Sequence, residues 1–452
     1  MTALSPNYFG VTMDSTMDST MISVFRSNPY LAVRVEAPVA SIASLESPLH
    51  VGFLLDVSYS MSGERLAAVK RTLEAVLPLF RDTDFCTIAT FSSSAKTVIS
   101  KVVMDAAGKD TFLTQTREMI TDGNTDLGLG ITHLSSLHRD YSAVIILTDG
   151  EITAGVGSND GIRALLRGFG SCPIHTLGYG AEHNRRLLNS IAINSCATYT
   201  FVDAETTLPV SMSDLLEGLR TEVLHNAVVS LASTSLWKSI ELNAEGATDH
   251  RLGGIVPGRS YWSIFMTTDP IGATAAPSRV TLRALEGEFT CDSTCDSIDS
   301  TASEAVQEQI MRARVASLLS SCTAELEHPR SGRGGRDALD ASIQVLLDDI
   351  GDSVLPLMLR MKGQLIDMRG HLQNMRGRHD LEFGLTFADG PTTSSRDLAR
   401  FTSVTGVLSC QRGVTRYTTD QDPDQTFSSP GQRNASQNVS AVYSQNPTAD
   451  NE

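Results

Sequence analysis

Residues 48–222 alternate between two hydrophobic patterns, one typical of buried strands and one typical of amphipathic helices. The apolar run 51–55 has the length and composition of a buried parallel strand. Further strands are predicted near 84–91, 96–103, 143–149, 173–178 and 198–203. Between them, apolar residues recur at steps of three and four, as in the helix predicted from Leu66 to Phe80. This alternation predicts an α/β domain with a doubly wound, mostly parallel sheet. The close linkage of 84–91 and 96–103 indicates one antiparallel edge strand.

The flanking segments predict a second, smaller β domain. Alternating Leu31, Val33 and Val35 indicate a half-buried strand within residues 26–47. Short strands broken by Gly, Pro and Ser are predicted at 227–231, 239–242, 261–267 and 279–285. They favour a small antiparallel β-sandwich that, with a polar linker, spans residues 223–300. Because the ends of a domain's chain usually lie close together, the 31–36 strand could join this sandwich, with the α/β domain inserted into it.

The remaining chain divides into a helical region and two polar ends. A capping box at Thr301–Glu304 opens a helix that runs to about residue 326, and further helices are predicted at 336–350 and 352–377. A basic, glycine-rich break is expected at 329–335, and the whole helical region covers 301–378. Residues 1–25 and 379–452 are predicted to be largely disordered, although 401–417 could dock back on the fold.

Oxygen-bearing side chains follow the first predicted strand of the α/β domain. Asp56, Ser58 and Ser60 stand at i, i+2 and i+4, at the end where open α/β sheets bind ligands. Oxygen donors suit Mg²⁺ or Mn²⁺. Alone, this triplet fits a polar turn capping a helix equally well. Two later segments favour the metal, because one offers Thr125 at the start of a helix and the other ends a buried strand at Asp149.

In this order and spacing, the three segments resemble the von Willebrand factor A family and its metal-ion-dependent adhesion site. The resemblance covers about residues 48–222 and extends to 84–91 and 175–180. It implies that Ser58 and Ser60 bind the metal directly, and that Asp56, Thr125 and Asp149 bind it directly or through water. It also implies a protein partner whose Glu or Asp completes the metal's coordination.

The region after the α/β domain resembles, more weakly, that of some intracellular plant and fungal proteins of this family. Several of those carry a RING or U-box and act in ubiquitin ligation. No RING-like Cys/His array or recognisable U-box occurs in this sequence, so ligase activity is not implied.

Composition narrows the possible partners. The formal net charge of −16 argues against nucleic acid and anionic membranes, whose phosphates this chain would repel. The N-terminus does not read as a signal peptide, and no apolar run is long enough to span a bilayer. The seven cysteines are scattered and odd in number, as is common for free cytosolic thiols. We therefore expect a cytoplasmic protein.

Three functions remain open at this point. The first is an adaptor that binds an acidic partner residue through the metal. The second is a non-catalytic scaffold, or a subunit of a ubiquitin-ligase-type complex, with a structural or vestigial metal site. The third is a metal-dependent hydrolase that uses Glu151 or Asp126. No Gly-x-Ser-x-Gly elbow or His-Glu-x-x-His array occurs, and His133, His138, His175 and His183 form no ligand set, so we expect no enzymatic activity.

A methionine repeat marks the last predicted helix. Met361, Met368 and Met375 recur every seven residues, with Leu365 and Leu372 between them. This is a heptad seam, and it has two interpretations. The seam could pack on the preceding helices, or residues 352–377 could meet an external helix or self-associate.

Overall fold

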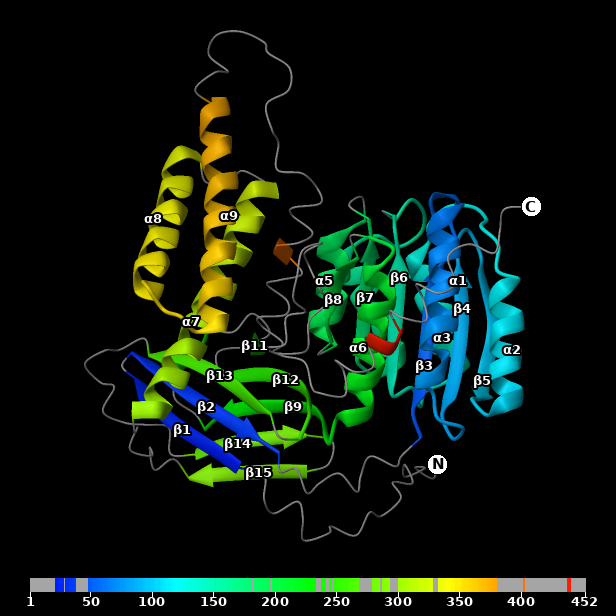
Figure 1. Ribbon diagram of the computed structural model, residues 1–452, viewed down its shortest axis with the longest axis horizontal. Helices are drawn as coiled ribbons and strands as arrows, with labels where there is room; N and C mark the ends of the chain where they lie inside the picture. Colours follow the sequence, from blue (N-terminus) through cyan, green and yellow to red (C-terminus); the bar gives the residue numbers. More distant parts are fainter. Residues whose placement is uncertain are drawn as a thin grey trace, which may run out of the picture.

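In the computed structural model, the chain forms an α/β domain, a β-sandwich and a helical layer (Figure 1). The structure describes residues 21–379 with gaps, the longest at 38–47, 268–278 and 293–299, and also residues 401–402 and 437–439.

The α/β domain is built on a six-stranded sheet of order β5-β4-β3-β6-β7-β8. The strands are β3 (His50–Asp56), β4 (Phe85–Phe91), β5 (Ala95–Val103), β6 (Ala143–Thr148), β7 (Ile174–Tyr179) and β8 (Tyr199–Val202). All neighbours pair in parallel except β5, which is antiparallel to β4. The predicted doubly wound, mostly parallel sheet with one antiparallel edge strand is confirmed.

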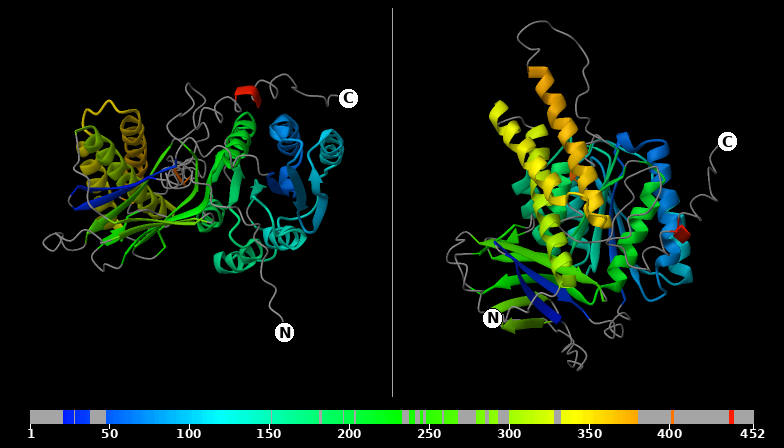
Figure 2. Two further views of the ribbon diagram at one scale, coloured as in Figure 1. Left: turned by 90° about the horizontal axis from the view of Figure 1, so that it is seen from below. Right: turned by 60° about the vertical axis from the view of Figure 1, so that its left-hand side comes forward.

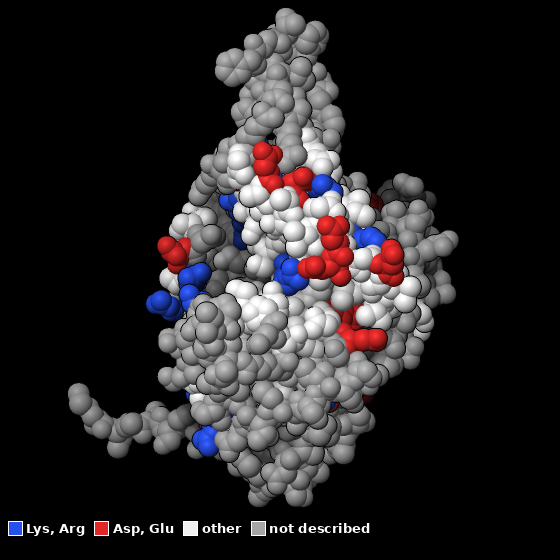
Figure 3. Space-filling view, turned by 90° about the vertical axis from the view of Figure 1, so that its left-hand side faces the viewer, with Lys and Arg blue, Asp and Glu red and all other residues white. Residues whose placement is uncertain are grey.

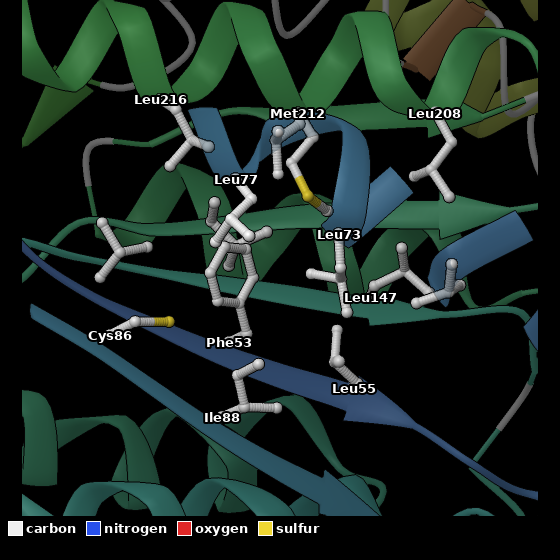
Figure 4. Packing of buried hydrophobic residues seen from close by; sticks show 14 of the residues in the cluster. Phe53, Leu55, Leu73, Leu77, Cys86, Ile88, Leu147, Leu208, Met212 and Leu216 are labelled. Atoms are coloured by element: carbon white, nitrogen blue, oxygen red, sulfur yellow. The ribbon is translucent and has the colours of Figure 1, made fainter. Parts of the chain in front are cut away.

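Helices cover both faces of this sheet because successive strand residues point to opposite sides. Phe53 and Leu55 pack with α1 (Glu64–Val76), α2 (Ala106–Arg117) and α6 (Thr207–Thr221), and part of this core is drawn in Figure 4. Leu54 packs on the other face, where the helices are α3 (Leu127–Leu137), α4 (Asn159–Leu166) and α5 (Arg185–Asn194). Strand β3 lies between β4 and β6, so the order of connection reverses beside its carboxyl end. Open α/β sheets bind their ligands at such a point.

Two antiparallel sheets form the sandwich. One has the order β1-β2-β13-β10 and the other β11-β12-β9-β14-β15. The strands are β1 (Met21–Ser27), β2 (Tyr30–Glu36), β9 (Leu224–Leu231), β10 (Trp237–Ser239), β11 (Ala244–Glu245), β12 (Asp249–Ile255), β13 (Ser260–Thr267), β14 (Arg279–Ala284) and β15 (Gly287–Asp292). Because β2 precedes the α/β domain and β9 follows it, the α/β domain is inserted between two sandwich strands, and the two units lie side by side (Figure 2).

Strand β1 corrects the expectation of a disordered N-terminus up to residue 25. It pairs with β2 along its whole length, from Met21 opposite Glu36 to Ser27 opposite Tyr30. Val24 enters the core between the two sheets, and Phe25 packs on the other side against Trp262. Burial on both faces of β1 therefore holds residues 21–25 in the fold. The sequence pattern did not predict β11, β12 and β15. It predicted a strand at 239–242, where the structure has β10 at Trp237–Ser239.

The helical layer consists of α7 (Ser300–Glu327), α8 (Gly332–Ile350) and α9 (Pro356–His379). Val306 and Ile310 of α7 pack on the sandwich against Trp262 and Ile264. Helix α8 begins inside the segment that was expected to be a break. Acidic and basic side chains are interspersed on the side of the molecule that carries this layer (Figure 3).

The methionine seam is part of the core of this layer. Met361, Leu365, Met368 and Leu372 are completely buried in a cluster with residues of α7 and α8, whereas the side chain of Met375 lies outside the described residues. The interpretation that the seam packs on the preceding helices is correct. The alternative, in which Met361 and Met368 meet an external helix, is wrong, because both are already buried within the chain.

Two residues of the C-terminal region also join the fold. Phe401 is buried in the helical cluster, where its ring contacts His371, and Val439 is buried in the core of the α/β domain. The burial of Phe401 agrees with the expectation that 401–417 could dock back on the fold, whereas Val439 corrects the prediction of disorder at its position. The remaining tail lies outside the described residues. Among the described helices, none has the length and apolar content needed to cross a bilayer.

Candidate functional site

Three loops meet at the carboxyl ends of β3 and β6. The loop after β3 is joined to the one before α3 by hydrogen bonds from Tyr59 N to Gly123 O, at 3.0 Å, and from Asp122 N to Val57 O, at 2.7 Å. The loop after β6 is joined to the same segment by a bond from Thr153 N to Thr125 O, at 3.1 Å. The three segments that the sequence singled out are thus held together by backbone hydrogen bonds.

Four of the five predicted site residues bring oxygen atoms to one place in this junction. The hydroxyl oxygens of Ser58 and Ser60 are 3.0 Å apart, and Ser60 donates a hydrogen bond to Asp149 Oδ1 at 2.7 Å. A Cβ atom added to Gly150 would lie 3.4 Å from Thr125 Oγ1 and 3.5 Å from Ser60 Oγ. Ser58, Thr125 and Asp149 are buried and Ser60 is exposed, so the cluster opens to solvent beside Ser60.

Asp56, the fifth predicted residue, is completely buried beneath this cluster. Its Oδ1 accepts a hydrogen bond from Ser58 N at 2.8 Å, and its Oδ2 accepts one from Thr148 Oγ1 at 2.5 Å. Burial raises the pKa of Asp56, the hydrogen bonds from Ser58 and Thr148 oppose this, and the nearby charge of Asp149 adds to it. Two buried acidic groups close together favour a cation at this point.

Two residues of the site were missed by sequence reasoning. Thr148 donates a hydrogen bond to the second oxygen of Asp56. Its position directly before Asp149 is the only feature of the sequence that indicates this role. Arg65, in the first turn of α1, forms an ion pair with Asp149. Its guanidinium also donates to Ser60 O at 3.2 Å.

The donor set fits a hard divalent cation. All five side chains offer oxygen, as Mg²⁺ and Mn²⁺ prefer. Elsewhere in the described part of the chain, no three His, Cys, Asp or Glu side chains gather to form a different metal site. The cluster at Asp56, Ser58, Ser60, Thr125 and Asp149 is therefore the candidate metal centre.

The groups considered for hydrolysis have structural partners. Asp126 caps α3 by accepting a hydrogen bond from Leu129 N at 2.9 Å. His183 is buried, with Nδ1 2.7 Å from Gly180 O and Nε2 2.7 Å from the Tyr199 hydroxyl. The Nδ1 of His175 lies 2.9 Å from Thr198 Oγ1. Glu151 lies outside the described residues.

Comparison with known proteins points to one family for the α/β domain. Residues 50–214 match the family model of the von Willebrand factor type A domain. Inter-alpha-trypsin inhibitor heavy chain H3 is 25% identical in Homo sapiens over 210 residues, and 26% identical in Bos taurus over 211 residues. Each match covers 42% of this chain and 24% of the relative, so the chain spans about a quarter of the length of the curated relatives it matches.

A solved structure extends the likeness beyond the α/β domain. It is a von Willebrand factor type A protein from Catenulispora acidiphila, with a TM-score of 0.58 and 14% sequence identity. The match covers 88% of this chain and 97% of that one. At this identity the comparison shows the fold alone.

Proposed function

We propose that this chain, which carries a von Willebrand factor type A domain at residues 50–214, binds a partner protein through a divalent metal. The metal is Mg²⁺ or Mn²⁺, held by Asp56, Ser58, Ser60, Thr125 and Asp149, and it takes a Glu or Asp of the partner as a further ligand. The observation that carries this proposal is the convergence of the three loops on one oxygen cluster, with Ser60 Oγ 2.7 Å from Asp149 Oδ1.

The charges of the site favour an acidic ligand. A bound dication supplies a Lewis-acidic position that exchanges water for a carboxylate. Both oxygens of Asp56 accept hydrogen bonds within the protein, whereas Asp149 Oδ1 lies 2.7 Å from the Oγ of the exposed Ser60. A partner carboxylate that replaces a water on the metal would be attracted to the dication and to Arg65 at a partly dry interface.

Binding without catalysis fits the surroundings of the cluster better than hydrolysis does. A hydrolase needs a free base positioned beside a metal-bound water. Asp126 caps α3, and His183 is fixed between Gly180 and Tyr199. We therefore propose an adaptor and not an enzyme.

A second candidate is supported by Arg65. Its ion pair with Asp149 places a cationic side chain of the protein at the proposed metal site. In this alternative the site is vestigial, Arg65 replaces the metal, and the chain acts as a scaffold.

Calorimetry with Mg²⁺ and Mn²⁺ tests both candidates. The metal adaptor requires binding to the wild type, and a loss of about tenfold or more in affinity for Ser60→Ala, Thr125→Ala and Asp149→Asn. Ser62→Ala is the matched control, because Ser62 is an exposed hydroxyl residue two positions beyond Ser60. If the wild type binds no metal although its circular dichroism spectrum is that of a folded protein, the scaffold candidate remains and the metal adaptor is excluded.

A further inference from the structure

Exposed apolar side chains are concentrated around the proposed metal site. Within the α/β domain, the described large hydrophobic residues that are exposed are Tyr59 (66%), Ile120 (74%), Leu129 (39%), Val156 (41%) and Val103 (39%). The first four belong to the loops that carry the site or to the first turn of α3 beside them, and only Val103 lies elsewhere, at the end of β5. We call Tyr59, Ile120, Leu129 and Val156 the apolar ring.

The hydrogen bonds that join the loops hold Tyr59 and Ile120 near the metal site, and the first turn of α3 places Val156 and Leu129 beside it. Tyr59 stands between Ser58 and Ser60, and its backbone N donates to Gly123 O at 3.0 Å. Ile120 lies two residues before Asp122, whose N donates to Val57 O. Val156 packs over the first turn of α3, where a Cβ added to Gly128 would lie 3.2 Å from Val156 Cβ. Leu129 follows in that turn.

A hollow adjoins the ring beside Ile120. It has a volume of about 260 Å³, and it is lined by apolar Val57, Val98, Met119 and Ile120 and by neutral polar residues, which are Thr90, Ser92, Ser94, Thr97 and Gln115. Val57 lies between Asp56 and Ser58, so the hollow shares the loop that forms the metal site. Its size is sufficient for one large side chain of a bound segment.

Charges at the edge of the hollow restrict what can enter it. Lys96 Nζ lies 3.8 Å from Asp122 Oδ2, so the charges of these two residues cancel. Glu118 also lines the hollow, and within the described residues it has no ion-pair partner, so the edge is negative overall. A second acidic residue of a partner would be repelled here, whereas an apolar side chain gains contact with Val57, Met119 and Ile120.

Single exposed hydrophobic residues are ordinary, but a group of them around a polar anchor is typical of a binding interface. Apolar contacts around a charged pair exclude water and strengthen its electrostatic attraction. We propose that the apolar ring selects partner segments in which the acidic residue is flanked by large aliphatic or aromatic side chains, one of which enters the hollow. This inference rests on the proposed metal-dependent binding.

A defined peptide library tests the selection. Pentapeptides of the form acetyl-X-X-Glu-X-X-amide, immobilised on beads, are incubated with the full chain in Mg²⁺ and then in EDTA. The expected result is EDTA-sensitive capture, with Leu, Ile, Met or Phe enriched at the flanking positions. Capture in Mg²⁺ without apolar enrichment overturns the inference and leaves the proposed function standing. No capture in Mg²⁺, when calorimetry detects bound metal, overturns both.

Substitutions locate the contact on the ring. Leu129→Asn and Ile120→Asn should each weaken binding of an enriched peptide about fivefold or more. Val103→Asn is the matched control for Leu129→Asn, because both residues are 39% exposed and Val103 lies away from the site. Calorimetry with Mg²⁺ on the same variants shows whether a lower peptide affinity comes from the lost apolar contact or from weaker metal binding. Equal peptide affinity in all three variants, or equal losses in Leu129→Asn and Val103→Asn, contradicts the inference.

Discussion

Arg65 forms an ion pair with Asp149, whose side chain is completely buried. The same nitrogen, Nη1, donates to Ser60 O at 3.2 Å, so one side chain links the loop after β3 to the end of β6. The Arg65 side chain is 42% exposed and lies at the rim, in the first turn of α1. A metal bound at Asp149 would therefore meet a positive charge that can move into solvent.

Replacing Arg65 should strengthen metal binding. Arg65→Gln removes a cation that competes for Asp149 and repels a bound dication, and we expect the affinity for Mg²⁺ to rise about tenfold in calorimetry. Arg71→Gln is the control, because Arg71 lies on the same helix but pairs with Glu64 and Glu205. A lower affinity in Arg65→Gln would mean instead that Arg65 orients Asp149 for the metal.

The strand pattern alone places two of the five candidate residues together, and the resemblance to the von Willebrand factor A family implies the full set. Asp56 and Asp149 each end a buried strand, and the carboxyl ends of parallel strands meet at one edge of a sheet. The role of Arg65 could not be predicted, because its partner lies 84 positions along the chain. The bond between Thr148 and Asp56, which joins two neighbouring strands, was missed for the same reason.

The fold shows a similar limit. Alternation and helical periodicity predict the doubly wound sheet, because each strand and helix there buries a distinctive face. Strand β1 was missed because its burial depends on β2 and α7, which local pattern does not reveal. The heptad seam of α9 predicts a packed face but not what covers it, and the structure shows that α7 and α8 do.

Asp84 should be important for the stability of the α/β domain. It is completely buried, and it accepts hydrogen bonds from Leu49 N at 3.0 Å, Arg81 N at 2.7 Å and Arg220 Nη2 at 2.6 Å. Asp84→Ala leaves Arg220 without this partner, so we expect the free energy of unfolding to fall by about 3–5 kcal/mol.

Urea denaturation followed by circular dichroism measures this loss. Asp82→Ala is the control, because the Asp82 side chain is 79% exposed and pairs with Lys109 at the surface. We expect that variant to lose less than about 1 kcal/mol. Similar losses in the two variants would show that the buried network has no special role.

His183 should make the α/β domain sensitive to acid. Burial lowers the pKa of His183 from 6.5 to about 4, so the folded state keeps it neutral while the unfolded state takes up a proton. Stability contributed by neutral His183 is therefore complete above pH 6.5 and is lost as the pH falls toward 4. The loss is about 3 kcal/mol across this range.

Urea midpoints measured at several pH values should fall less steeply for His183→Gln than for the wild type. His133→Gln is the matched control, because it removes a histidine at a half-buried site where Nε2 lies 2.8 Å from Thr97 Oγ1. Parallel curves for all three proteins would exclude His183 as the cause.

The two faces of α9 should respond differently to substitution. Met361 is completely buried against α7 and α8, whereas Leu359, two residues earlier, is 51% exposed. Met361→Ala leaves a cavity, so we expect it to lower the free energy of unfolding by about 2–5 kcal/mol. Leu359→Ala should cost less than about 1 kcal/mol, because little is buried there.

Thermal unfolding and sedimentation velocity, measured on the same samples, distinguish core packing from association. If the seam is core, Met361→Ala melts at a lower temperature and its sedimentation coefficient below the transition equals that of the wild type. A Met361→Ala variant with unchanged melting but an altered oligomeric state would contradict the packing of this seam on α7 and α8. If Leu359→Ala alone changes the oligomeric state, association through residues 352–377 uses the exposed face of α9, because the methionine face is already covered within the chain.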